Sequence, residues 1–250
     1  SMQPFSCLQR LIDMIQRVKT LAVWGDSILK GIVQGYGGKR FGICDENCLK
    51  IAGEELGISV INHCYFGGTI TKGKSIMTRD IESGIECDSA IIEFGGNDCN
   101  YNWKEVCAQR DVHHEPYTPL KEFIAHMQDM INLARNNNIR PILMTLPPLE
   151  PDRYFKTISH SLDDAYILEW LGDAHYLYRW QEMYSLEAAK LALKNNCFMI
   201  DMRKAFLAEH NYQRLICEDG IHPNEEGHRF MADVLIEVTK EARRDHVKIA

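Results

Sequence analysis

The segment Thr20-Leu21-Ala22-Val23-Trp24-Gly25-Asp26-Ser27 joins a short apolar run to a Gly-Asp-Ser turn. The run lacks the alternation of polar and apolar residues that a half-exposed strand shows, so it predicts a strand buried on both faces. Helical periodicity broken by glycines follows, up to about residue 55. We therefore expect a strand, a tight turn and a helix, in this order.

Four more apolar runs predict further strands of the same sheet. They are residues 58–61, 89–94, 141–146 and 197–200, and stretches able to form helices separate them. The clearest helices are expected at 119–136, at 163–194 as one helix or a pair, and at 224–244. This alternation indicates the α/β class, as a three-layer α/β/α sandwich around a five-stranded parallel sheet.

The chain of 250 residues shows no linker or internal repeat, so we expect one domain over 1–250 with its core at about 20–245. Apolar side chains spaced by three and four predict a packing helix at about 5–17. Segments 99–118 and 147–162 follow strand ends, which is where ligands bind in open α/β sheets.

The overall composition limits the partners and the location that we expect. A net charge of -7 argues against nucleic acid, and no apolar run approaches the roughly 20 residues that cross a bilayer. Nine cysteines, an odd number, and the lack of a charged and apolar signal segment favour a reducing, cytoplasmic location. No sequence pattern indicates the oligomeric state.

Two groups of residues invite comparison with metal sites. Cys44 and Cys48, with His63 or Cys64, resemble part of a zinc site, but no second close pair completes a tetrahedral set. The run 113–115 is His-His-Glu, and consecutive residues seldom converge on one ion. We therefore expect no metal.

Ser27 stands where the first strand turns into a helix, with Gly31 four residues on. This places a hydroxyl at a helix N-terminus, where backbone N–H groups can hold an anion. Asp and Ser are also common helix caps, and capping explains an isolated Gly-Asp-Ser turn as well or better.

A second polar motif, residues 219–224, reads Asp-Gly-Ile-His-Pro-Asn. Asp219 stands three residues before His222, so its carboxylate can accept the Nδ1 proton and leave Nε2 free to deprotonate a serine. The alternative is a plain turn before a helix that starts near Pro223, with His222 at the surface. The motif alone supports both interpretations equally.

Two glycine-containing turns lie between these motifs in the chain. Asn97 follows a glycine pair after the third apolar run, and Gly67 and Gly68 follow the second run. An amide side chain and a glycine N–H at such places can donate to a developing oxyanion, although ordinary turns have the same residues.

In this order, the four motifs resemble the sequence blocks of the SGNH/GDSL hydrolases. The blocks are Gly25-Asp26-Ser27-Ile28 with Gly31, Gly67 with Thr69, Gly96-Asn97-Asp98, and Asp219-Gly220-Ile221-His222-Pro223. The resemblance spans residues 21 to about 235. It implies a flavodoxin-like sandwich and a serine esterase or acylhydrolase that needs no metal or organic cofactor.

The resemblance also implies roles for individual residues. Ser27 would be the nucleophile, His222 the general base and Asp219 its orienting carboxylate. The backbone N–H of Ser27, the N–H of Gly67 and the side chain of Asn97 would form the oxyanion hole. Phe66 departs from the family pattern, which has a small residue there. The neighbouring Gly68 leaves the glycine donor open by one position, with Gly67 favoured.

The substrate is less well defined by the sequence than the reaction. Tyr101 and Trp103 lie in a polar and aromatic segment expected to overhang Ser27, where sugar rings could stack. Asp26 is expected to fix the turn and to border the substrate. The aromatics of 154–184 fall largely at helical spacing, which favours packing over recognition.

We expect a short acyl group, with acetyl as the first candidate, on a carbohydrate or small-molecule ester. The alternative within the class is a lysophospholipase or thioesterase that acts on lipids. An alternative of another class is a non-catalytic binding protein that keeps the fold, against which the intact Ser27, Asp219 and His222 argue.

Overall fold

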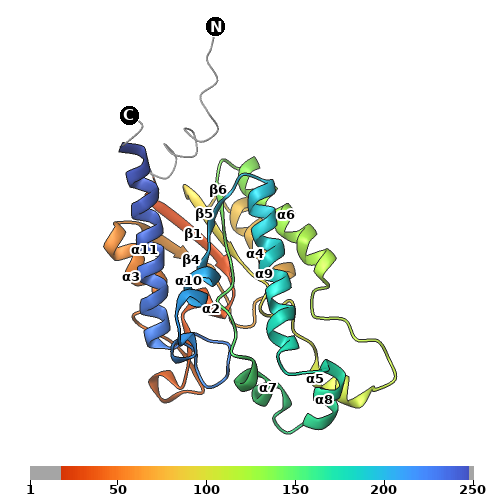
Figure 1. Ribbon diagram of the computed structural model, residues 1–250. Coiled ribbons are helices and arrows are strands. Elements are labelled where there is room, and N and C mark those ends of the chain that lie inside the picture. The colour runs from red at the N-terminus through yellow and green to blue at the C-terminus, as the bar shows by residue number, and fades with distance from the viewer. Residues whose placement is uncertain (1–17, 248–250) are drawn as a thin grey trace.

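The computed structural model describes residues 18–247. A five-stranded sheet, parallel throughout, lies in the middle of the molecule with the strand order β4-β1-β5-β6-β7 (Figure 1). Its strands are β1 (Thr20–Gly25), β4 (Ser59–Asn62), β5 (Ser89–Glu93), β6 (Arg140–Met144) and β7 (Phe198–Ile200). Counted along the chain within this sheet, the order is 2-1-3-4-5, that of flavodoxin-like folds.

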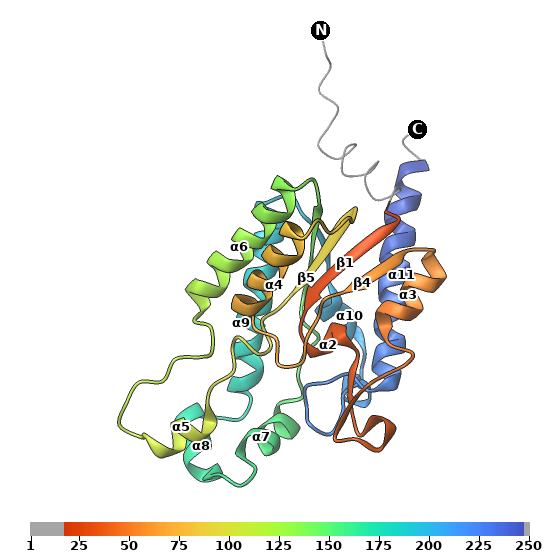
Figure 2. The same cartoon turned by 180° about the vertical axis from the view of Figure 1, so that it is seen from behind.

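Helices cover both faces of the sheet and complete the predicted three layers (Figures 1 and 2). One face carries α4 (Ile70–Glu82), α6 (Leu120–Asn136) and α9 (Tyr176–Lys194), and the other carries α3 (Cys48–Leu56), α10 (Met202–Ala208) and α11 (Glu225–Val247). In β1, Ala22 and Trp24 pack into the first core while Val23 packs into the second. The continuously apolar run is thus explained by a strand buried on both faces.

Three short helices form a separate group at the end of the sheet where α2 begins (Figure 1). They are α5 (Trp103–Ala108), α7 (Pro151–Ser159) and α8 (Asp164–Leu171). Their apolar side chains share a cluster of their own, apart from the two cores on the sheet. The segments expected as insertions at the strand ends contain α5 and α7.

The predicted strands and main helices are confirmed close to their expected bounds. The stretch 163–194 forms the pair α8 and α9, which separates at Gly172, a residue with a positive φ of 82°. The expected helices at 119–136 and 224–244 correspond to α6 and α11. The packing helix expected at 5–17 lies outside the described residues.

The region after the Gly-Asp-Ser turn differs from the expected single helix. The helix α2 (Ser27–Lys30) ends after one turn, because Gly31 adopts a left-handed conformation with φ of 87°. An antiparallel hairpin then follows, with β2 (Ile32–Gln34) and β3 (Phe41–Ile43) joined through a 3-10 turn, η1 (Tyr36–Gly38). Neither α10 nor the 3-10 turn η2 (Tyr212–Leu215) was predicted.

Within residues 18–247, no helix combines the length and the apolar character needed to cross a membrane.

Candidate active site

The end of β1 places Ser27 at the first position of α2. Asp26 caps this helix, since its Oδ1 accepts a 2.8 Å hydrogen bond from the backbone N–H of Ile28. The expectation that Asp26 fixes the turn is therefore confirmed. Ser27 itself is largely buried, with its side chain directed to the loop that precedes α11.

That loop contributes His222 and Asp219, which complete a chain of hydrogen bonds from Ser27. The Oγ of Ser27 lies 2.8 Å from Nε2 of His222, and Nδ1 of His222 lies 2.6 Å from Oδ2 of Asp219. All three side chains are buried. The structure thus brings together the three residues that the sequence predicted, and His222 does not lie at the surface.

Local hydrogen bonds hold the carboxylate of Asp219 in its ionised form. Oδ1 of Asp219 accepts from the backbone N–H groups of Ile221 and His222, at 2.9 and 3.1 Å. Burial opposes ionisation, but the hydrogen bond and charge of His222 and these two backbone donors outweigh it, so the pKa of Asp219 lies below its ordinary value. Asp219 can therefore stabilise a positive charge on the imidazole.

Two neighbouring elements fix the position of the Asp219–His222 loop. The backbone N–H of Asp219 donates to Oε1 of Gln34 on β2, at 2.9 Å. The carbonyl of Gly220 accepts from the backbone N–H of Glu150, the residue that caps α7, at 2.8 Å. Gly220 has a positive φ of 78°, and its backbone packs directly against the first turn of α7.

The predicted oxyanion residues lie beside the nucleophile turn. Nδ2 of Asn97 donates to the carbonyl of Gly68 at 3.0 Å and lies 3.4 Å from Oδ2 of Asp26. Gly67 has a left-handed φ of 69°, and the space around its α-carbon is open. Gly68 instead packs against the α-carbon of Asp26, so a Cβ there would come within 3.1 Å of backbone. The choice of Gly67 over Gly68 as the oxyanion donor stays a prediction.

Three buried carboxyl groups gather behind Ser27, and one of them, Glu93, was not singled out in the sequence. Oε2 of Glu93 lies 3.4 Å from the backbone nitrogen of Asp26. Burial raises the pKa values of Asp26 and Asp98 to about 6 and that of Glu93 well above its ordinary range, where the charge of Asp26 adds to the effect. Glu93 could have been noticed in the sequence as an acidic residue at the end of an apolar strand. Such a position is unusual, because an unpaired Glu is rarely buried.

Two phenylalanines surround the imidazole of His222. The ring of Phe66 stacks on it with a centroid distance of 6.0 Å and an interplanar angle of 9°. The ring of Phe41, from β3, lies 5.4 Å from it. Phe66 was noticeable in the sequence as a departure from the family pattern, whereas Phe41 depends on a hairpin that was not predicted.

The three side chains expected to border the substrate are buried and contact other groups of the protein. Tyr101 and Trp103 are only 8% and 6% exposed, and both contact the ring of Trp170 on α8. Nε1 of Trp103 donates to Oδ1 of Asn100 at 2.8 Å. Asp26 is buried with its oxygens directed at protein atoms. Contact of these three residues with a substrate stays a prediction.

The candidate metal ligands from the sequence lie in different environments. Cys44 packs with Val33 and Cys217, whereas Cys48 and Cys64 belong to the core under α3 and α11. Among residues 18–247, no three His, Cys, Asp or Glu side chains are arranged to hold a metal ion. His113 forms an exposed pair with Glu115 at 2.8 Å.

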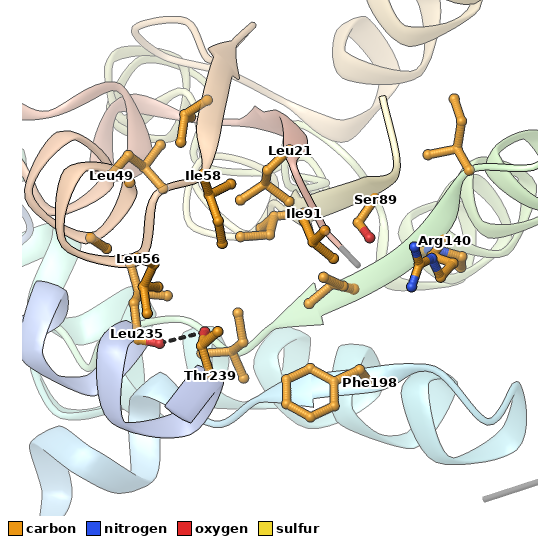
Figure 3. Close-up of a pocket in the computed structure, with 18 of the residues that line it drawn as sticks. Leu21, Leu49, Leu56, Ile58, Ser89, Ile91, Arg140, Phe198, Leu235 and Thr239 are labelled. Atoms are coloured by element: carbon orange, nitrogen blue, oxygen red, sulfur yellow. Dashed lines mark hydrogen bonds between the residues drawn. The ribbon is translucent and has the colours of Figure 1, made fainter. Parts of the chain in front are cut away.

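A cavity of about 540 Å³ lies between the sheet, α3 and α11, away from Ser27 (Figure 3). Leu49 and Leu56 of α3, Leu235 of α11 and Phe198 of β7 point toward it. Ser89 and the first residues of β6 line it as well, so it lies at the amino ends of the strands. Its lining is mainly apolar and includes none of the predicted site residues, so this cavity is separate from the candidate site at Ser27.

Comparison with known proteins identifies a family that matches most of the chain. Residues 23–230 match the model of the GDSL-like Lipase/Acylhydrolase family. The GDSL esterase/lipase WDL1 of Oryza sativa subsp. japonica is 23% identical over 169 residues, which are 66% of this chain and 58% of the relative. The Isoamyl acetate-hydrolyzing esterase 1 homolog of Bos taurus is 31% identical over 96 residues, 36% of this chain and 35% of the relative.

Solved structures share the fold over most of the chain. A lipase/acylhydrolase from Enterococcus faecalis superposes with a TM-score of 0.63 at 17% identity, covering 89% of this chain and 96% of that one. A catalytic mutant of Axe2, an acetylxylan esterase from Geobacillus stearothermophilus, gives 0.60 at 19% identity, with 88% and 94% covered. With the family model matched over residues 23–230, the chain belongs to the GDSL-like Lipase/Acylhydrolase family.

Proposed function

We propose that the protein is a serine esterase that forms an acyl-enzyme on Ser27. The observation that carries this proposal is the buried chain of short contacts from Oγ of Ser27 through His222 to Asp219, at 2.8 and 2.6 Å. A nucleophile, a base within hydrogen-bond reach and a carboxylate that orients the base are what this chemistry requires.

The first half of the reaction releases the alcohol. Oγ of Ser27 attacks the ester carbonyl carbon while Nε2 of His222 takes the hydroxyl proton, and a tetrahedral oxyanion forms. Asp219 stabilises the resulting imidazolium through Nδ1. The intermediate then expels the alkoxide oxygen, which takes the proton from Nε2 and leaves as the alcohol.

The oxyanion is stabilised by the backbone N–H of Ser27, the N–H of Gly67 and the side chain of Asn97. For Asn97, the 3.0 Å bond to Gly68 holds the amide in place, and the 3.4 Å contact with Asp26 is too long to be strong. We assign the side-chain amide of Asn97 as the third donor to the oxyanion.

The second half of the reaction restores the enzyme. His222 removes a proton from water, whose oxygen attacks the acyl carbon, and the same three donors hold the second oxyanion. Collapse of this intermediate breaks the bond to Oγ of Ser27, which regains its proton from His222. The acid is released and no other group is consumed.

We assign the acyl group as short, with acetyl the best candidate. Two similar proteins support this choice by their names, since Axe2 is described as an acetylxylan esterase and the Bos taurus relative as an isoamyl acetate-hydrolyzing esterase homolog. Their alcohols, a carbohydrate and a small aliphatic alcohol, fit the expected carbohydrate or small-molecule ester.

A fluorophosphonate probe tests the nucleophile directly. The serine oxygen displaces fluoride from phosphorus, so the wild-type protein gains a covalent label and Ser27→Ala gains none. Ser83→Ala changes an exposed serine at the end of α4 and serves as the matched control that still labels. Folded wild-type protein that takes no label would instead favour a binding protein without catalysis.

A series of 4-nitrophenyl esters tests the acyl group. With acetate, butyrate and octanoate, the leaving alcohol is constant and only the acyl chain changes. We expect kcat/KM to fall steeply beyond acetate. A preference for octanoate would contradict the short-acyl assignment and favour a lipid acylhydrolase.

A further inference from the structure

The exposed face beside the imidazole of His222 is aromatic. The two rings there, Phe66 and Phe41, contact each other with a centroid distance of 5.3 Å, and both contact His222. They come from separate parts of the chain, one from the loop after β4 and one from β3. A continuous aromatic wall therefore stands next to the general base.

The side chain of Phe66 is exposed to solvent although it is large and apolar. It is 52% exposed, in contrast to the buried Phe94, Phe123 and Phe206 of the cores. An exposed apolar surface beside converging polar groups is typical of a ligand site. Contacts within the protein thus cover only one part of the Phe66 ring.

The chemistry of the proposed reaction decides which half of the ester meets this wall. Nε2 of His222 must reach the leaving oxygen to protonate it, so the alcohol lies beside the imidazole during acylation. The carbonyl oxygen points instead to Asn97 and Gly67. A side chain that stacks on the imidazole therefore borders the alcohol and not the acyl group.

We propose that Phe66, supported by Phe41, is a specificity-determining residue that selects esters whose leaving alcohol has a flat or ring-shaped apolar face. Aryl groups and the C–H face of a pyranose ring have such a face. The guanidinium of Arg40 lies over the Phe41 ring, 5.6 Å from its centroid. This inference rests on the proposed function, because it needs His222 to act on the leaving oxygen.

Two series of substrates test the inference with Phe66→Ala. The first keeps the acetyl group and changes the alcohol, from 2-methoxyethyl to cyclohexylmethyl and benzyl. The second keeps the 2-methoxyethyl alcohol and changes the acyl group from acetyl to butyryl. Leu193→Ala, which removes a 72% exposed side chain at the end of α9, is the matched control.

We expect Phe66→Ala to lower kcat/KM for benzyl acetate about five- to tenfold, as loss of an aromatic contact does, and that for 2-methoxyethyl acetate less than twofold. The acyl series should keep its wild-type ratio, and the rate of deacylation should not change because the alcohol has already left. Phe41→Ala should show the same selectivity to a smaller degree.

An equal loss for all three alcohols, or a loss that follows the acyl chain, would overturn the inference while leaving the esterase proposal intact. Hydrolysis that survives in Ser27→Ala would overturn the proposed function itself, so the two failures are distinguishable. Circular dichroism confirms that each variant folds, and Phe66→Leu separates ring stacking from simple apolar contact.

Discussion

The side-chain oxygen of Gln34 accepts a 2.9 Å hydrogen bond from the backbone N–H of Asp219, and so ties the hairpin β2–β3 to the loop that bears His222. Gln34→Ala removes the acceptor and leaves this N–H without its partner. We expect kcat/KM for 4-nitrophenyl acetate to fall about five- to tenfold, equivalent to roughly 1 kcal/mol for one hydrogen bond. The exposed Gln109 provides the control as Gln109→Ala, and equal rates for both variants would contradict the role of the tie.

Asn97→Ala removes one of the three proposed oxyanion donors. We expect kcat to fall by about 10² to 10³, with a smaller effect on KM, because the donor acts mainly on the charge that develops in the transition state. Steady-state kinetics with 4-nitrophenyl acetate measures both constants. Asn137→Ala, at the exposed end of α6, is the control, and a wild-type rate in Asn97→Ala would exclude the assigned donor.

Asp219→Asn keeps the shape of the side chain but loses the charge that holds the Nδ1 proton. The imidazole can then adopt the wrong tautomer toward Ser27, and we expect kcat to fall on the order of 10⁴-fold. Labelling by the fluorophosphonate should slow in parallel. A variant that stays within tenfold of the wild type on both measurements would rule out Asp219 as the orienting group.

Gly220 and Gly84 both have positive φ, at 78° and 82°, but only Gly220 is crowded. A Cβ on Gly220 would lie 2.7 Å from the carbonyl oxygen of Glu150 and would also overlap the backbone nitrogen of Tyr154. Gly84→Ala meets no atom within 4 Å and should lower the free energy of unfolding by only about 1 kcal/mol.

Gly220→Ala must in addition displace the His222 loop from α7. We expect a larger fall in thermal stability than in Gly84→Ala, together with a loss of esterase activity that Gly84→Ala does not show. Differential scanning calorimetry and initial rates on the two variants make the comparison. Equal melting temperatures and equal rates would show that α7 does not position the loop.

Because of the buried His228 on α11, we expect the free energy of unfolding to depend on pH. Burial lowers its pKa from 6.5 to about 4, and the charge of His222 adds to this effect. The unfolded chain binds a proton on this residue at higher pH than the folded chain does. The contribution of His228 to the free energy of unfolding is therefore complete above pH 6.5 and is lost as pH falls toward 4. The loss is on the order of 3 kcal/mol.

His228→Leu has no such proton to bind. Urea unfolding at several pH values should give a difference in free energy between wild type and variant that changes between pH 6.5 and 4, with the wild type losing more. A constant difference over this range would show that His228 takes up no proton on unfolding there. Buried Asp26 and Asp98 titrate in both proteins, and their effects cancel in the difference.

The sheet was predictable because its central strands β1 and β5 are buried on both faces. A continuously apolar run such as β1 has few alternatives in a soluble chain, and helices between such runs leave only a parallel arrangement. The hairpin was not predictable from local pattern. β2 and β3 have three residues each, and contacts distant in sequence, such as that of Gln34 with Asp219, help hold them.

The site shows the same division between local and distant causes. The turn at Ser27 and the Asp219–His222 motif follow from their own neighbours, which cap a helix and form a tight loop. The burial of Tyr101 and Trp103 depends on Trp170, a residue of another helix that no pattern near 101–103 reveals. The packing of these two side chains with Trp170 could therefore not be predicted from the segment alone, and their contact with a substrate stays a prediction.

The two hydrogen bonds of the His222 ring, to Ser27 and to Asp219, also differ in how they form during folding. Asp219 and His222 are three residues apart, so their hydrogen bond can form as soon as the loop does. The contact of His222 with Ser27 spans 195 residues and requires β1 to have taken its place in the sheet. In a refolding experiment, ester hydrolysis would therefore return only with the last long-range contacts. The recovery of activity would then report that folding is complete.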